Sequence, residues 1–362
     1  MTTRDQHDPI TSTTATTMPP AAAQAALLAA ALDDTVAEAA WRLIASARRI
    51  VLLAHENPDP DALGSALGLA HALEPLGKSC VVACADPPPP TFDFIPGIER
   101  VVSELPSEDF DLVIALDAGE LTRYGALYFR HQVFFDGATI LNLDHHVTST
   151  GCGLVNIIDV PSAATAELLT LFLLNRGVAI DRETATCLLA GIITDTRAFE
   201  FDATTARTLA AGAYLVAQGA IPERIIKPFY RMKPLAKARL WGLALATLGS
   251  SPNGRMIWAE VRPDMFAAAG ASSDMDDGLS SYLIDIEGAR IATLFKEQAD
   301  GTTRISMRTA GPNDAAAIMA RFGGGGHMRA AGCTLQATLP AAKATVLAYV
   351  EQHLAPEEAT TP

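Results

Sequence analysis

Apolar and polar positions alternate in two different ways along this chain. In the first half, short unbroken runs of Val, Ile and Leu alternate with longer segments of helical periodicity. Strands are predicted at 50–54, 79–84, 111–116 and 139–143, and helices at 62–76, 163–175, 181–193 and 204–218. Unbroken apolar runs are typical of parallel strands covered on both faces. The pattern therefore predicts an α/β domain with a doubly wound, mostly parallel sheet.

The pattern changes at residues 219–236, where Pro-punctuated and more basic sequence indicates a linker. Beyond it, strands are predicted near 255–261, 289–296 and 303–308, and helices near 274–286, 313–321 and 339–353. This order indicates a smaller α+β domain. We expect residues 1–34 to be an N-terminal extension, disordered over 1–20, with Ala-rich helical sequence following to about residue 48. The two domains are predicted at 35–218 and 237–355.

Composition supports two folded domains and limits the ligands. The chain has 362 residues, of which 49% are hydrophobic, which suits two buried cores better than one. Its net charge is −14, and residues 1–236 carry 16 Lys and Arg against 28 Asp and Glu. Binding of long duplexes depends on many Lys and Arg contacts to phosphate, so this class of ligand is excluded. Small anions remain possible, because bound dications would reverse the local potential.

The cysteines and the N-terminus indicate a cytoplasmic protein. The five cysteines are scattered and form no CxxC pair, so a disulfide framework and a zinc knuckle are both disfavoured. Residues 1–32 are Thr-, Pro- and Ala-rich, and we read no signal peptide and no membrane span there.

Acidic and imidazole side chains follow three of the predicted strands of the first domain, and one further candidate, Asp195, follows the predicted helix 181–193. The candidates are His55, Asp59 and Asp61 in HENPDPDALGS, Asp117 after LVIAL, Asp144-His145-His146 in NLDHH, and Asp195 in GIITDT. If the strands are neighbours, these groups meet at one sheet edge, where crowded carboxylates require compensating positive charge. The sequence thus predicts a site for two divalent ions. Carboxylate and imidazole ligands without thiolate suit Mn²⁺ best, with Mg²⁺, Co²⁺ or Fe²⁺ less favoured and zinc left open.

Simpler interpretations exist for each piece. Asp61 alone is typical of a turn or helix N-cap, and a lone His-His pair is often a surface feature. We expect His71 to be structural and His131 and His353 to lie on the surface. Gly77-Lys78-Ser79 follows a predicted helix rather than a strand, so we reject a phosphate-binding P-loop. The joint occurrence of the other pieces behind apolar strands favours the metal site.

These motifs resemble, in order, those of the DHH phosphoesterases. HENPDPDALGS, LVIALD, NLDHH and GIITDT match the catalytic domain, and Arg308-Thr309 with FGGGGHMRAAG resembles the DHH-associated substrate-binding domain. The likeness covers roughly residues 35–350. The chain most resembles the nanoRNase/pAp-phosphatase branch, and it resembles the exonuclease RecJ less, because additional nucleic-acid-binding domains are missing.

The resemblance implies roles for the candidate residues. His55, Asp59 and Asp117 would bind one Mn²⁺, and Asp61, Asp117, His145 and Asp195 the other, with Asp117 bridging. His146 would contact the scissile phosphate or assist proton transfer, and Asp144 would orient an imidazole from behind. The family also often dimerises through the catalytic domain, so the resemblance allows a homodimer, although the sequence itself does not indicate the oligomeric state.

Two residues depart from the family pattern. Pro60 stands where Gly is common between the two aspartates of the first motif, so the turn must accept a φ near −65°. Arg197 stands where Gly often follows the fourth motif. Its side chain would either narrow the pocket or add a phosphate contact.

The glycine run near the C-terminus has two interpretations. Alone, it is typical of a flexible surface loop. Followed by His327 and Arg329, the glycines Gly324, Gly325 and Gly326 instead suggest close backbone approach to an anion. Arg308 would add a bidentate phosphate contact. We expect these six residues to bind substrate.

The leading hypothesis is a Mn²⁺-dependent phosphoesterase that hydrolyses short oligoribonucleotides to mononucleotides and also 3′-phosphoadenosine 5′-phosphate (pAp) to AMP. Water would attack phosphorus in line with the leaving 3′-oxygen. The alternative within enzymes is a cyclic- or linear-dinucleotide phosphodiesterase, such as one acting on c-di-AMP or pApA. A polyphosphatase is less favoured, because that relative lacks the glycine–histidine loop. The non-enzymatic alternative is a nucleotide sensor, which the intact ligand set disfavours.

Overall fold

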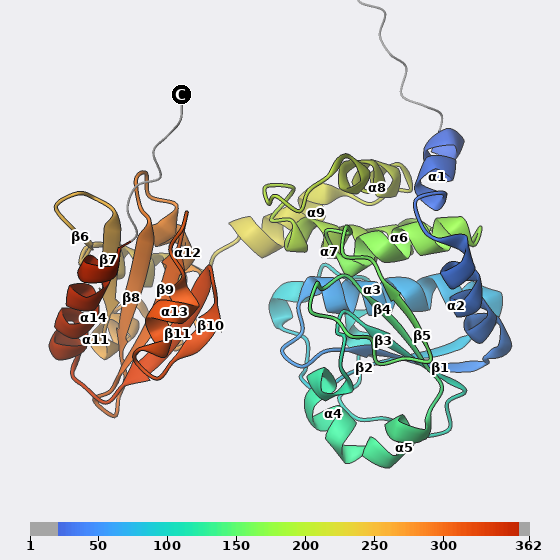
Figure 1. The fold of residues 1–362 in the computed structure, drawn as a ribbon, viewed down its shortest axis with the longest axis horizontal. Coiled ribbons are helices and arrows are strands. Elements are labelled where there is room, and N and C mark those ends of the chain that lie inside the picture. The colour runs from blue at the N-terminus through green and yellow to red at the C-terminus, as the bar shows by residue number, and fades with distance from the viewer. Residues whose placement is uncertain (1–20, 355–362) are drawn as a thin grey trace, which may run out of the picture. The chain divides into compact units, whose positions relative to one another are not determined.

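The computed structural model describes residues 21–354, which form two compact units divided between Met232 and Lys233 (Figure 1). The predicted linker, 219–236, contains the helix α9 (Pro222–Ile226), the π-helical turn η5 (Lys227–Arg231) and the start of α10 at Leu235. Residues 1–20, for which disorder was predicted, lie outside the described residues. None of the helices within 21–354 has the length and apolar character needed to cross a bilayer.

The first unit is an α/β unit with one parallel sheet. Its strands are β1 (Arg49–Ala54), β2 (Ser79–Cys84), β3 (Leu112–Leu116), β4 (Ile140–Asp144) and β5 (Val155–Ile158). Its helices are α1 (Ala21–Ala29), α2 (Asp34–Ser46), α3 (Pro60–Leu73), α4 (Gly125–Arg130), α5 (Gln132–Gly137), α6 (Thr165–Asn175), α7 (Arg182–Asp195), α8 (Ala206–Ala217) and α9. Short 3-10 turns are η1 (Glu74–Leu76), η2 (Pro90–Phe92), η3 (Ile98–Arg100) and η4 (Leu121–Tyr124).

The strand order is β2-β1-β3-β4-β5, and all four pairings are parallel. The chain changes its direction of travel across the sheet between β1 and β3. In doubly wound sheets, ligands bind outside the carboxyl ends of the strands at such a switch point. The predicted fold class is therefore confirmed, and the topology places the functional edge beside β1 and β3.

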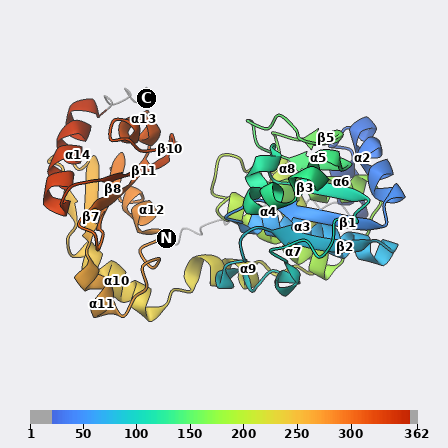
Figure 2. The same ribbon diagram turned by 90° about the horizontal axis from the view of Figure 1, so that it is seen from below.

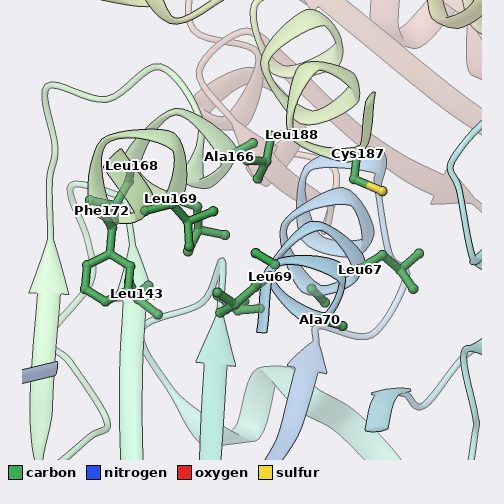
Figure 3. Packing of buried hydrophobic residues seen from close by; sticks show 14 of the residues in the cluster. Leu67, Leu69, Ala70, Leu143, Ala166, Leu168, Leu169, Phe172, Cys187 and Leu188 are labelled. Atoms are coloured by element: carbon green, nitrogen blue, oxygen red, sulfur yellow. The ribbon is translucent and has the colours of Figure 1, made fainter. Parts of the chain in front are cut away.

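Both faces of this sheet are covered, which explains the unbroken apolar runs. Ile50 and Leu52 of β1 pack under α3, α6 and α7, whereas Val51 and Leu53 face a second core with α4 and α5. Figure 3 shows the first of these cores, where Leu67 of α3, Leu188 of α7 and Phe172 of α6 lie above the strands. This packing fixes the N-terminal ends of α3 and α6 at the carboxyl edge of the sheet.

Besides α9, which lies in the predicted linker, the strand β5 and the helices α4 and α5 of this unit were not predicted. The strand β5 has only four residues, and α4 and α5 have six each. The predicted extension, 1–34, contains α1, whose Leu28 is buried against the core and whose Gln24 side chain donates to the Ala210 carbonyl. Within the described residues, this part of the extension is therefore packed helix.

The second unit is an α+β unit with a mostly antiparallel sheet. Its strands are β6 (Gly249–Ser250), β7 (Met256–Val261), β8 (Ile291–Glu297), β9 (Thr303–Thr309), β10 (Gly325–His327) and β11 (Ala330–Leu335). Its helices are α10 (Leu235–Leu245), α11 (Pro263–Ala269), α12 (Leu279–Ile284), α13 (Ala315–Ala320) and α14 (Leu339–His353). The order is β10-β11-β9-β8-β7-β6, and only β7 and β8 run parallel.

Helices cover both faces of this second sheet as well. One core lies between the sheet and α13 and α14, and the other lies between the sheet and α10, α11 and α12. Figure 2 shows α14 and α12 on opposite sides of β8. The glycine run, one interpretation of which was a flexible loop, contributes Gly325 and Gly326 to the strand β10, which pairs with β11 in an antiparallel hairpin.

Candidate active site

All six predicted metal ligands meet at the switch point of the first sheet. His55 follows β1, Asp59 and Asp61 begin α3, Asp117 follows β3, His145 follows β4, and Asp195 ends α7. Three groups have ligand atoms within 4.8 Å of one another: His55 with Asp59 and Asp117, Asp61 with His145 and Asp195, and a third, Asp117 with His145 and His146, that shares one residue with each of the others. This grouping matches the pairing of ligands that the family resemblance implies, apart from the bridging role of Asp117 in the second group.

Distances tie Asp117 to both groups. Its Oδ2 lies 3.5 Å from Nε2 of His55, and its Oδ1 lies 3.6 Å from Nε2 of His145. Nε2 of His55 is also 3.8 Å from Asp59 Oδ2, and Nε2 of His145 is 3.3 Å from Asp195 Oδ2. These separations exceed direct hydrogen bonds and leave room for a cation between the atoms. Asp117 therefore lies between the two groups and is close to a histidine of each.

Backbone carbonyls orient the two imidazoles. Nδ1 of His55 lies 2.8 Å from the Glu56 carbonyl oxygen, and Nδ1 of His145 lies 3.1 Å from that of Ser162. A carbonyl only accepts, so Nδ1 carries the proton and Nε2 keeps its lone pair. Both Nε2 atoms face the carboxylates, which is the arrangement that metal-binding histidines adopt.

The carboxylate of Asp61 is wholly buried and held by the start of α6. It accepts hydrogen bonds from the amides of Thr165 (2.7 Å) and Ala166 (3.0 Å). Helix N-termini favour anions, which helps to explain its tolerance of burial. Gly191 of α7 lies beside it, and a Cβ there would come within 2.3 Å of Asp61 Oδ1. The glycine of GIITDT is therefore needed for this close approach.

Burial and mutual repulsion raise the pKa values of three carboxyl groups here. Burial, followed by repulsion from Asp61 and Asp117, raises the pKa of Asp195 to about 9. Burial likewise raises the pKa of Asp61, and burial with repulsion from Asp61 raises the pKa of Asp117 well above its usual range. Asp195 also ends α7, where the helix dipole disfavours an anion. A divalent cation would remove this penalty, so the donor set and its charge fit such an ion.

Asp144 and His146 form a separate hydrogen-bonded pair beside the cluster. Oδ1 of Asp144 accepts from Nδ1 of His146 at 2.7 Å and from the backbone amides of His145 and His146. Although burial opposes it, the bond to His146 holds the pKa of Asp144 below its usual range, and the same bond raises the pKa of His146. The His146 side chain is half exposed, which leaves its Nε2 open to a ligand.

The two departures from the family pattern have different structural settings. Pro60 occupies the first turn of α3 directly after the N-cap residue Asp59, a position where its fixed φ suits the helix. Arg197 begins three consecutive residues with positive φ, and its guanidinium lies 3.3 Å from Glu200. Asp117 also has a positive φ of 59°, which is uncommon outside glycine and concentrates at functional sites.

The predicted substrate-binding residues of the second unit divide into two groups. Arg308, Gly324, Gly325 and Gly326 line a pocket of about 840 Å³, together with Asp276, Asp277, Lys296 and Arg304. His327 is exposed and Arg329 donates to the backbone carbonyls of Gly311 (2.5 Å) and Asn313 (3.2 Å); neither lines the pocket. Burial lowers the pKa of Arg308, as desolvation of a cation does.

The remaining histidines and the rejected P-loop have structural settings of their own. His71 is mostly buried, near the Pro96 carbonyl, and His353 stacks on Tyr349. His131 is held by the carboxylates of Glu104 and Glu108, so it is less exposed than predicted. Lys78 of the GKS tripeptide donates to the carbonyls of Ala45 and Ala47 at the end of α2.

Sequence reasoning missed the groups that hold the ligands in place. The Thr165 hydroxyl donates to Asp117 Oδ1 at 2.8 Å, and the Ser65 hydroxyl lies 3.5 Å from Asp61 Oδ1. Small polar residues near helix starts are common as caps, and nothing in their spacing distinguishes these two. Their role appears only once α6 is placed against α3.

Known proteins resemble the chain in both units. The family model described as DHH family, N-terminal domain, matches residues 49–192, and that of the DHHA1 domain matches residues 257–355. The bifunctional oligoribonuclease and PAP phosphatase NrnA of Thermus thermophilus is 33% identical over 82% of this chain and 88% of its own length. The cyclic-di-AMP phosphodiesterase GdpP of Geobacillus thermodenitrificans is 25% identical over 83% of this chain, which spans 46% of that protein.

A solved structure supports the fold independently. An exopolyphosphatase-related protein from Bacteroides fragilis superposes with a TM-score of 0.80 at 20% identity, covering 89% of this chain and 97% of that one. At this identity the likeness concerns architecture alone.

Proposed function

Because the chain belongs to the DHH phosphoesterase family, we propose that it hydrolyses short oligoribonucleotides to mononucleotides and pAp to AMP. The observation that carries the proposal is the convergence of His55, Asp59, Asp61, Asp117, His145 and Asp195 at one sheet edge. The NrnA relative, at 33% identity over most of both chains, supports the choice of substrate class.

Two divalent ions, with Mn²⁺ preferred, would be held by these residues. His55, Asp59 and Asp117 would hold one, and Asp61, Asp117, His145 and Asp195 the other. Ligands of oxygen and imidazole nitrogen without sulfur suit Mn²⁺. When bound, such ions activate water and polarise a phosphoryl oxygen.

Asp144 and His146 would act on the substrate side of the cluster. Asp144 fixes Nδ1 of His146 and so directs the open Nε2 toward the substrate. The hydrogen bond to Asp144 raises the pKa of His146, which favours the protonated imidazole as a donor to the phosphate or to the leaving oxygen. These are the positioning and proton-handling roles that the protein itself supplies.

The pocket of the second unit would bind the nucleotide away from the scissile bond. Arg308 offers a planar cation for a phosphate, and the lack of side chains on the hairpin glycines allows a ligand to approach the backbone closely. A pocket of this size suits one or two nucleotides, in agreement with short substrates and the exclusion of long duplexes. Cytoplasmic location and a homodimer are further parts of the proposal.

The second candidate is hydrolysis of cyclic or linear dinucleotides such as c-di-AMP or pApA. The observation in its favour is the likeness to the GdpP relative, which is weaker than the likeness to NrnA. A nucleotide sensor without catalysis is disfavoured, because all six ligand positions carry metal-binding side chains.

A substrate panel tests the proposal. Purified full-length protein is assayed with pAp, two- to five-residue RNA and c-di-AMP, each with Mn²⁺, with Mg²⁺ and with chelator. We expect hydrolysis of pAp and short RNA with Mn²⁺, and none with chelator. Preference for c-di-AMP would favour the alternative, and metal-independent hydrolysis would overturn the mechanism.

A further inference from the structure

The start of α6 holds three of the proposed ligands at once. Residues 162–166 form the ligand-holding segment: the Ser162 carbonyl faces His145 Nδ1, the amides of Thr165 and Ala166 donate to Asp61, and the Thr165 hydroxyl donates to Asp117. These contacts serve one side of the cluster. His55 and Asp59 have no hydrogen bond to this segment among the described residues.

A buried charge network anchors this segment. Glu167 is wholly buried, and its Oε2 accepts from the Ala163 amide (3.0 Å) and the Thr208 hydroxyl (2.8 Å). Its Oε1 accepts from Nε of Arg207 on α8 at 2.8 Å. The buried carboxylate therefore connects the backbone of the segment to α8.

The same arginine reaches the other end of the segment. Nη2 of Arg207 donates to Asp159 Oδ2 at 2.6 Å and to the Ser162 hydroxyl at 3.0 Å, and that hydroxyl donates to Asp159 at 2.6 Å. Arg207 thus connects Asp159 and Ser162, which precede α6, to Glu167 in the first turn of α6. Burial of the ion pairs between Arg207 and its two carboxylate partners carries a desolvation penalty, so these pairs are weak evidence for a role in stability alone.

We propose that Arg207 is a positioning residue for the metal centre. By fixing Glu167, Asp159 and Ser162, its guanidinium sets the place of the ligand-holding segment and hence the orientation of Asp61, Asp117 and His145. This inference rests on the proposed function only in that these three residues bind divalent ions. It predicts a larger effect on the ion held by Asp61, His145 and Asp195 than on the ion held by His55 and Asp59.

The opposite end of the same helix offers a matched control. Arg176, at the C-cap of α6, pairs with Asp34 and Glu38 of α2 and is also mostly buried. Arg176 thus has two carboxylate partners, as Arg207 does, but it contacts none of the proposed metal ligands. Loss of either arginine removes two ion pairs, although Asp34 and Glu38 are more exposed than Asp159 and Glu167, and of the two arginines only Arg207 contacts the ligand-holding segment.

The test is calorimetric titration of Mn²⁺ into chelator-stripped full-length protein, with thermal unfolding measured in parallel. For Arg207→Met we expect the affinity for one of two ions to fall about 10- to 100-fold, the range measured when groups behind metal ligands are removed. For Arg176→Met we expect a lower Tm with both Mn²⁺ affinities unchanged. In kinetics, Arg207→Met should lower kcat at saturating Mn²⁺ with little change in KM.

The outcomes separate the two proposals. Wild-type Mn²⁺ affinities in folded Arg207→Met, or an equal loss in Arg176→Met, would overturn the positioning role. If Arg207→Met does not fold, Arg207→Lys and Glu167→Gln replace it; wild-type affinities in both would likewise overturn it. Failure of the unmutated protein to bind two Mn²⁺ would instead overturn the proposed function.

Discussion

The metal-site edge of the first unit and the glycine-lined pocket of the second are built in different ways. At the edge, side chains at the ends of β1, α3, β3, β4 and α7 converge; His55, Asp61 and Asp117 are buried, and the start of α6 holds Asp61, Asp117 and His145 by hydrogen bonds. In the pocket, backbone of the β10–β11 hairpin forms one wall. Chemistry at phosphorus needs charges fixed in place, whereas nucleotide binding tolerates an open wall of backbone groups.

Substitution of Asp117 tests whether the metal-site edge depends on charges fixed in place, and it has the largest expected effect. Asp117→Asn keeps the shape and the tolerance of positive φ but removes a charge. Because even groups behind metal ligands contribute about 10- to 100-fold, we expect turnover to fall by more than about 100-fold. In chelator its Tm should rise, because one of three mutually repelling carboxyl groups is neutralised. Steady-state rates and thermal unfolding with and without Mn²⁺ measure both effects; undiminished hydrolysis would remove the bridging role.

Substitution of Arg308 tests whether the pocket of the second unit binds substrate, and substitution of Arg329 is the control. Arg308→Ala removes a cation from the pocket wall, and a charge-assisted hydrogen bond of about 1.5–3 kcal/mol corresponds to a rise in KM of roughly 10- to 100-fold. Its kcat should be retained, because the metal-site edge is unchanged. Arg329→Ala should lower the Tm with little change in KM, since its guanidinium contacts backbone carbonyls. Equal KM increases in both variants would contradict this division.

Two neighbouring glycines sharpen the description of the backbone wall. A Cβ at Gly324 would lie 2.2 Å from the Gly332 carbonyl oxygen, whereas a Cβ at Gly325 meets nothing within 4 Å. Gly324→Ala should therefore lose about 1–3 kcal/mol of stability. Gly325→Ala should unfold like the unmutated protein and raise KM if substrate approaches this backbone. Denaturant unfolding and pAp kinetics distinguish the two; matching losses of stability would refute the steric explanation.

Pro60 gives the smallest expected effect. Its ring fixes the first turn of α3, so Pro60→Gly should lower the free energy of unfolding by about 1 kcal/mol through greater freedom of the unfolded chain. Mn²⁺ affinity and kcat should change little, because Asp59 still caps the helix with its side chain. Urea unfolding with Mn²⁺ titration measures this, and a large loss of Mn²⁺ affinity would show that the metal-site edge depends on the proline.

The sequence predicted the parts of the site that are made of characteristic side chains. Carboxylates and histidines after apolar strands predicted the metal-site edge, because parallel strands end at the same edge. The sequence was silent on Thr165 and Ser162, whose hydroxyl, amide and carbonyl groups act only after α6 packs beside α3. It was equally silent on Arg207, whose partners lie 40 to 48 residues away.

The β10–β11 hairpin was missed for a different reason. Glycine has low strand propensity, so a run of four reads as a loop when judged locally. Pairing with β11 overrides that preference, since β11 is itself fixed by β9. Short elements such as β5 were missed because four residues carry too little periodicity to recognise.

The carbonyl groups behind His55 and His145 have an evolutionary consequence. Because main-chain atoms, rather than neighbouring side chains, choose the tautomer of each imidazole, no single codon change at the residues that supply them can remove that choice. Substitution of the Glu56 or Ser162 side chain therefore leaves the accepting carbonyl in the chain, and both rings continue to present the same nitrogen as long as the path of the backbone is kept.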